Sequence, residues 1–182
     1  MTVFPKARIL LSLASNRLSD WQARSKAPMA VLELCDLKTA LQEGQRLLGL
    51  DLGEKTIGLA LSDTSLTVAT PLKTLKRGKF TVDAKRLDDL VAEHGIGGLI
   101  VGLPLNMDGT PGRSAQSARA FARNFAGRSA VPLAMVDERL STIAANRALL
   151  EADSSRQKRQ ESVDKVAAAY ILQGALDRLR TA

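Results

Sequence analysis

The chain has 182 residues, of which 45% are hydrophobic and 25% are charged, so wholesale disorder and collagen-like repeats are excluded. A single cysteine and a single histidine exclude an internal disulfide and a metal site built from thiolates or imidazoles. The net charge of +7 permits a polyanionic partner, and the 19 acidic residues leave oxygen atoms as the ligands for any metal.

Residues 1–44 are expected to form an N-terminal extension, poorly ordered, ahead of a folded domain. The apolar run at 9–14 is six residues long, shorter than the roughly 7–15 of a secretory signal core. No stretch approaches the roughly 20 apolar residues of a membrane span, so we expect no membrane contact. The use of a single cysteine fits a reducing cytoplasm, where we expect the protein to be located. Alternatively, Met29 is the true start of the protein, which the intact mass of the native protein would test.

The first elements of the domain are expected to be strands. Apolar runs at 46–52 and 56–62 are joined by a three-residue turn, which predicts a β-hairpin. The run at 66–75 predicts a third strand, and Pro71 places it at a sheet edge or a bulge because proline has no N–H to donate. The domain therefore begins with an antiparallel unit.

The rest of the domain alternates helices and strands. Apolar positions spaced through 79–94 predict an amphipathic helix that ends at Gly95. Further strands are expected at 98–102 and 131–136, and further helices near 114–125, 142–152 and 162–179. A hairpin followed by βα units predicts one α/β domain over 45–182, with a mixed sheet covered by helices.

Acidic side chains stand at the ends of predicted strands and in the last predicted helix. Asp51 closes the first strand, Asp137 and Glu138 follow the strand at 131–136, and Asp164 falls in the expected first turn of the last helix. Each has an ordinary alternative role: capping a turn, pairing with Arg139, or favouring a helix N-terminus. As a group they are the oxygen ligands that Mg²⁺ or Mn²⁺ requires.

Four segments resemble one family in order and spacing. They are LLGLDLGEKTIGLALSD (47–63), IVGLPLNMDGTPG (100–112), VDERLST (136–142) and VDKVAAAYILQGAL (163–176). The resemblance is to the YqgF/RuvX family, whose members are described both as Holliday-junction resolvases and as pre-16S rRNA nucleases. It implies a ribonuclease H-like fold, with a mixed sheet of about five strands and helices on both faces, and nuclease chemistry assisted by a divalent metal.

The resemblance also implies roles for individual residues. It makes Asp51, Glu138 and Asp164 the catalytic acids that bind the metal. Asp137 is expected on the opposite face of its strand, in a supporting role, and Arg139 either contacts the phosphate or holds an acid in place. Many members carry Arg where this chain has Thr56, which casts doubt on a cation acting at that position.

Substrate contacts are expected in three places. The loop 103–112 could present a helix N-terminus to a phosphate, or could be an ordinary connection between a strand and a helix. The cations before the last helix are expected to form an exposed basic loop that contacts the nucleic-acid backbone, although a charge run can also be plain solvated surface. The candidate substrate-binding residues are Lys55, Asn106, Asp108, Arg156, Lys158 and Arg159.

The predicted function is that of a hydrolase of phosphodiester bonds, an endonuclease using Mg²⁺ or Mn²⁺ on structured nucleic acid. Processing of the 5′ end of pre-16S rRNA in ribosome biogenesis is favoured, by a monomer or a homodimer. One alternative is a Holliday junction resolvase in DNA recombination or repair, and another is a non-catalytic nucleic-acid-binding factor in ribosome assembly. Segment 47–63 also resembles the first phosphate loop of actin-like and sugar-kinase ATPases, but those proteins need two such domains.

Overall fold

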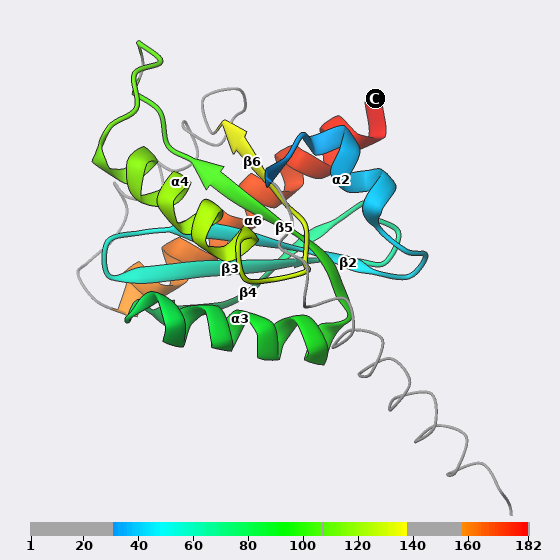
Figure 1. The fold of residues 1–182 in the computed structure, drawn as a ribbon, viewed down its shortest axis with the longest axis horizontal. Coiled ribbons are helices and arrows are strands. Elements are labelled where there is room, and N and C mark those ends of the chain that lie inside the picture. The colour runs from blue at the N-terminus through cyan, green and yellow to red at the C-terminus, as the bar shows by residue number, and fades with distance from the viewer. Residues whose placement is uncertain (1–30, 107, 138–157, 182) are drawn as a thin grey trace, which may run out of the picture.

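A mixed sheet with helices on both faces forms the domain (Figure 1). The structure is a computed structural model that describes residues 31–106, 108–137 and 158–181. In this part of the chain the sheet has six strands, in the order β1-β6-β5-β2-β3-β4. The mixed sheet covered on both faces confirms the predicted fold class.

The middle and one edge of the sheet are an antiparallel meander. Its strands are β2 (Arg46–Leu52), β3 (Thr56–Ser62) and β4 (Ala69–Lys76), with β3 paired to both of the others. The apolar run of β2 is almost wholly buried, as its sequence predicts. Pro71 lies on the edge strand β4, where the register to β3 shifts, which confirms the expectation for that proline.

The other half of the sheet is parallel. After β4 the chain forms α3 (Phe80–His94), β5 (Ile96–Leu103), α4 (Arg113–Ala126) and β6 (Leu133–Asp137). Helix α3 ends at Gly95, whose φ of 64° is the left-handed conformation that glycine adopts without a Cβ clash. Since β5 is parallel to both β2 and β6, the carboxyl ends of these three strands lie at the same edge of the sheet.

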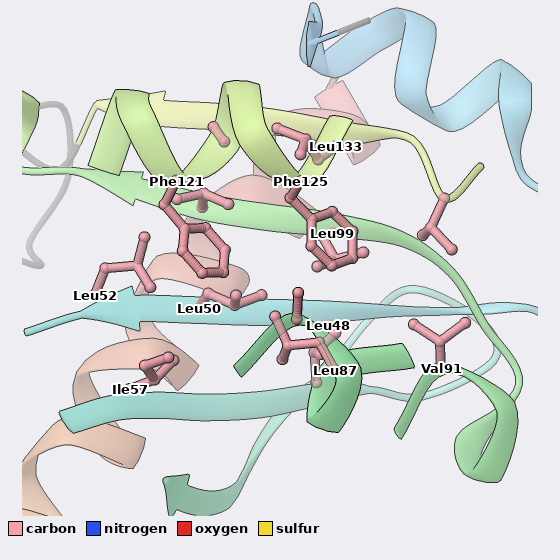
Figure 2. Close-up of a cluster of buried hydrophobic side chains, with 14 of the residues drawn as sticks. Leu48, Leu50, Leu52, Ile57, Leu87, Val91, Leu99, Phe121, Phe125 and Leu133 are labelled. Carbon is pink, nitrogen blue, oxygen red and sulfur yellow. The ribbon is translucent and has the colours of Figure 1, made fainter. Parts of the chain in front are cut away.

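Each face of the sheet has its own core. Large side chains of α3 and α4, among them Leu87, Phe121 and Phe125, pack on one face (Figure 2). The long helix α6 (Lys158–Thr181) packs on the other face through Ala168, Ile171 and neighbouring apolar residues. The sheet is therefore buried on both sides.

Part of the expected N-terminal extension belongs to the fold. Strand β1 (Val31–Leu32) pairs in parallel with β6 at the sheet edge, and α2 (Leu34–Ala40) buries Leu37 completely in the core on the α6 side. Lys38 Nζ donates to the main-chain oxygen of Leu179, 2.6 Å away, near the end of α6. The expectation of poor order for 1–44 is therefore wrong for 31–40, and residues 1–30 lie outside the described part.

The last helix begins earlier than predicted. Helix α6 starts at Lys158, four residues before the expected position, because Lys, Arg, Gln and Glu are good helix formers even without an apolar stripe. Lys158 and Arg159 therefore lie in its first turn and not in a loop, which corrects that prediction. The helix expected at 142–152 lies outside the described residues. No helix within the described ranges is long and apolar enough to cross a membrane.

Candidate active site

Asp51 is a buried carboxylate near the carboxyl end of β2. Only 4% of the residue is exposed, although carboxylates are seldom buried at all. Its neighbours at alternate positions, Leu47 and Gly49, face α6: Leu47 belongs to the core on that side, and a Cβ on Gly49 would stand 2.7 Å from Cβ of Leu172. Since side chains alternate along a strand, Asp51 also faces α6.

Asp164 reaches the same place from α6. Asp51 is paired across the antiparallel ladder with Gly58 of β3. A Cβ on Gly58 would overlap the carbonyl oxygen of Asp164, so the backbone of α6 lies directly against β3 at this glycine. Cross-strand partners point to the same face, so Asp51 and Asp164 share one side of the sheet at neighbouring positions.

The carboxylate of Asp164 is fixed by Thr56. The Thr56 hydroxyl donates a hydrogen bond of 2.6 Å to Oδ2 of Asp164. The length is that of a strong O–H···O⁻ bond. Asp164 is the seventh residue of α6 and lies in its second turn. The alternative prediction, that Asp164 only stabilises the helix N-terminus, is therefore wrong. Thr56, at the position where many members of the resembled family carry Arg, thus provides a neutral hydrogen-bond donor to a predicted catalytic acid.

Asp137 closes β6 at the same edge of the sheet but on the other face. In β6, Leu133 and Met135 pack with the α3 and α4 core, whereas Ala134 and Val136 pack with the α6 core. Continued alternation puts Asp137 on the α3 and α4 side, on the face opposite to that of Asp51, and its supporting role stays a prediction. Glu138 follows in the chain and lies outside the described residues, as do Arg139 and Arg156.

The loop after β5 is a closed turn. Leu105 and Pro111 form a β-bridge, and Thr110 donates to Oδ1 of Asp108 from both its backbone N–H and its hydroxyl. Asn106 Nδ2 donates to the Thr110 hydroxyl at 2.9 Å. Asn106 and Asp108 thus shape the turn, and both remain exposed at the start of α4.

The β2–β3 turn, which carries Lys55, is fixed by hydrogen bonds from both the side chain and the backbone of Arg77. Arg77, just after β4, donates from its guanidinium to the carbonyl of Gly53 at 2.5 Å and to the hydroxyl of Ser117 in α4 at 2.9 Å. The Arg77 backbone N–H donates to the carbonyl of Lys55 at 2.8 Å. Lys55 itself is exposed, so its ammonium group is presented to solvent from a fixed turn.

The described part of the site therefore contains two of the three predicted acids. Within 31–106, 108–137 and 158–181, no three Asp, Glu, His or Cys side chains gather closely enough to hold a metal ion. Lys158 and Arg159 begin α6, the helix that carries Asp164, and their side chains lie outside the described part. That all three predicted acids form one site therefore stays a prediction.

Sequence reasoning missed Thr56 and Arg77 as parts of this site. Thr56 contacts a residue 108 positions away, and no local pattern reports such a contact. Gly58 was an available signal, because a glycine inside a strand often marks the close approach of another backbone. Arg77 carried no comparable signal.

Comparison with known proteins identifies the family. Residues 45–178 match the family model described as "RuvX: Holliday junction resolvase". The chain belongs to the RuvX family. The match covers β2 to α6, and it confirms the resemblance seen in the four sequence segments.

Relatives within the RuvX family are close. A protein of Roseobacter denitrificans named "Putative pre-16S rRNA nuclease" is 59% identical over 84% of this chain and 94% of its own length. A protein of the same name from Paramagnetospirillum magneticum is 58% identical over 82% of this chain and 96% of its own length. Both names and the family description denote nucleases, so this chain is a RuvX-family nuclease that acts on nucleic acid.

Two resolvases of known structure match over most of this chain. RuvC of Thermus thermophilus in complex with a Holliday junction matches with a TM-score of 0.48 and 14% identity, over 76% of this chain and 98% of that one. The yeast mitochondrial resolvase Ydc2 matches with a TM-score of 0.41 and 11% identity, over 80% of this chain and 85% of that one.

Proposed function

We propose that this protein is a divalent-metal-dependent endonuclease that processes the 5′ end of pre-16S rRNA. Membership of the RuvX family and the names of its close relatives support nuclease chemistry on ribosomal RNA. The observation that carries the proposal is the placement of Asp51 and Asp164. A buried carboxylate at a strand end and a second carboxylate on the helix packed over its cross-strand partner share one face of the sheet.

The residues fit a hard divalent cation. Carboxylate oxygens are the ligands that Mg²⁺ and Mn²⁺ take, and Asp51 and Asp164 supply them from two rigid elements. We propose that these two acids and Glu138 hold the ion. When bound, the ion offsets the negative charge that the acids and the phosphodiester bring together, and it polarises the phosphoryl group.

The chain's cations are proposed to hold the substrate. Lys55 is exposed on a turn fixed by Arg77, close in sequence to Asp51, and we propose that its ammonium group contacts a phosphate. Lys158 and Arg159 start the helix that carries Asp164, and we propose the same role for them and for Arg156. We also propose that Asn106 and Asp108 bind substrate, through the turn that they shape after the carboxyl end of β5.

Cleavage by Asp51→Asn protein tests the proposal. The substitution preserves shape and removes the charge that would hold the metal, so cleavage of a 16S rRNA precursor should be lost while the circular dichroism spectrum stays that of wild type. Wild-type protein should cleave with Mg²⁺ and not with EDTA. Asp89→Asn is the matched control, since it removes an exposed carboxylate on α3 and should cleave normally.

The outcomes separate the possibilities. Wild-type cleavage by the Asp51→Asn protein would show that Asp51 is not a metal ligand. Cleavage in EDTA would remove the metal from the mechanism. Nucleic-acid binding without cleavage by wild type under any metal would favour the non-catalytic assembly factor.

Resolution of Holliday junctions is the second candidate, favoured by the description of the matching family. Both substrates present the same phosphodiester, so the same site could serve either. A four-way DNA junction run beside the rRNA precursor, with the same enzyme and metal, distinguishes them. Faster cleavage of the junction would overturn the proposal of rRNA processing and leave the nuclease chemistry in place.

A further inference from the structure

Thr56 lies where it can set the direction of the Asp164 carboxylate. Its hydroxyl donates to Oδ2 of Asp164 at 2.6 Å, across 108 residues of sequence. Fixing one oxygen of a carboxylate also fixes where the other oxygen, Oδ1, points. A group that forms a hydrogen bond to a metal ligand in this way orients the ligand and typically changes its affinity for the metal.

The hydroxyl is itself held in place. Thr56 is the first residue of β3, and as a β-branched residue it has few side-chain rotamers. A Cβ on Gly53 would stand 3.3 Å from Oγ1 of Thr56 and 3.2 Å from its carbonyl oxygen, so the turn folds tightly over this residue. Arg77 fixes that turn by its bond to the Gly53 carbonyl.

The acceptor is held as well. The carbonyl of Asp164 lies against the Cα of Gly58, so the backbone of α6 cannot approach β3 any further at this point. Thr56 and Gly58 lie two residues apart on the same face of β3, the face to which Asp51 also points. Donor and acceptor therefore come from two elements in direct backbone contact, and little conformational freedom is lost when the bond forms.

We propose that Thr56 is a positioning residue for the metal: it orients Asp164 so that the carboxylate and Asp51 act on one divalent cation. The proposal rests on the metal-dependent function proposed above. Because the hydroxyl is neutral, it fixes the carboxylate and leaves its negative charge available to the cation.

Titration calorimetry with Mn²⁺ alone, without nucleic acid, tests the proposal. Thr56→Val keeps the shape and removes the hydroxyl, and we expect about 10-fold weaker Mn²⁺ binding, at the lower end of the usual loss for such outer partners. Thr56→Ser restores a hydroxyl and should bind within about 3-fold of wild type. Thr39→Val is the matched control, since its hydroxyl bonds only a main-chain oxygen in α2.

Thermal unfolding of the same variants in EDTA separates positioning from plain stability. A structural role alone would lower the melting temperature of Thr56→Val and leave Mn²⁺ affinity unchanged, and that result would overturn the proposal. Asp51→Asn protein distinguishes the two proposals. If wild type binds no Mn²⁺, or if Asp51→Asn binds it as wild type does, the proposed metal site fails. If wild type binds, Asp51→Asn does not, and Thr56→Val binds as wild type, only the role of Thr56 fails.

Discussion

The two faces of the sheet are packed by opposite means. On one face α3 and α4 insert large side chains, including Phe121 and Phe125, whose rings stack with centroids 6.2 Å apart (Figure 2). On the other face α6 approaches the strands at glycines: a Cβ on Gly49 would lie 2.9 Å from the carbonyl of Ala168, and one on Gly58 would overlap Asp164. Large side chains bury much apolar area, whereas glycine lets one backbone touch another.

This difference indicates a division of tasks between the faces. Burial of Leu and Phe side chains contributes most of the stability that a core provides. Close contact at glycine buries less area but places Asp164 beside the cross-strand partner of Asp51 within a narrow tolerance. We therefore expect stability and catalysis to respond differently to changes on the two faces.

The largest loss of stability is expected from Phe125→Ala on the α3 and α4 face. Phe125 is fully buried, and truncation of such a side chain costs about 3–5 kcal/mol of unfolding free energy. The cleavage rate per folded molecule should stay close to wild type, because the cavity lies on the face away from Asp164. Urea unfolding and single-turnover rates at saturating enzyme measure both quantities.

Phe125→Leu serves as the control, because it leaves a smaller cavity and should cost less. The division of tasks would be contradicted if Phe125→Ala abolished cleavage in protein shown to be folded.

Gly58→Ala should give the reverse pattern on the α6 face. The added methyl group must push α6 away from β3, at a cost of about 1–3 kcal/mol, as for other overpacked sites. We expect the cleavage rate to fall at least 10-fold, because the shift moves Asp164 away from Asp51. Unfolding free energy and single-turnover rate are again the measurements.

Gly127→Ala is the matched control. A Cβ there would stand 3.4 Å from the nearest atom, the carbonyl of Arg123, and the φ of −71° suits alanine. This variant should fold and cleave as wild type does. A Gly58→Ala protein with unchanged activity would show that close packing at this point does not position the acid.

The same contrast explains how much could be predicted from the sequence. Apolar runs and helical periodicity predicted the bounds of β2, β3, α3 and α4 to within one residue, because these elements bury regular apolar patterns. Strand β1 is two residues long and α2 buries one leucine fully, so neither carries enough pattern to be recognised. The start of α6 was missed because its first turn is polar.

The candidate site divides in a similar way. Asp51 and Asp164 could be selected because carboxylates beside apolar runs are unusual and stand in family motifs. Their supports could not be selected: Thr56 and Arg77 act through contacts between distant segments, which form only when the sheet and helices assemble. Register and alternation then put Asp51 on the α6 face, a result that no single segment contains.

Arg77 links the β2–β3 turn to α4 on the α3 and α4 face, and Arg77→Ala should have an intermediate effect. Its guanidinium links the turn after Asp51 to Ser117 of α4, and loss of both bonds at this half-buried site should cost about 1–2 kcal/mol. Because the turn also fixes Thr56, cleavage should fall further than stability alone explains. Denaturant unfolding and cleavage rates measure the two effects.

Ser117→Ala removes one of the two partners of the Arg77 guanidinium and should cost less than Arg77→Ala. Arg86→Ala is a control on α3 that, like Arg77→Ala, removes two contacts: a bond to the main chain of Lys76 and an ion pair of 3.5 Å with Asp83. Equal cleavage rates for Arg77→Ala and Arg86→Ala would show that Arg77 serves only stability.

The smallest effect concerns acid sensitivity on the two faces. Asp63 begins the turn after β3, and Gln173 of α6 contacts this turn. The pKa of Asp63 is lowered from 3.8 to about 2 by hydrogen bonds from the hydroxyl of Ser65 and from the backbone N–H groups of Val68 and Thr67. On α3, burial raises the pKa of Asp88 more than the adjacent Arg128 lowers it. The two carboxylates are therefore shifted in opposite directions.

The signs of the two contributions follow from these shifts. Asp63 binds its proton more weakly in the folded state, so its stabilisation is complete above about pH 4 and is lost as the pH falls towards about 2. Asp88 binds its proton more tightly in the folded state, so its contribution favours folding at low pH and declines as the pH rises through its raised pKa. Urea unfolding of wild type, Asp63→Asn and Asp88→Asn at pH 3 and pH 7 tests these signs. The stability of wild type relative to each variant should change with pH, and the two changes should have opposite directions. The excess stability of wild type over Asp63→Asn should shrink at pH 3, whereas that over Asp88→Asn should grow. If the excess over Asp63→Asn does not shrink at pH 3, the turn at Asp63 does not hold its carboxylate ionised, and the α6 face has no acid-sensitive anchor there.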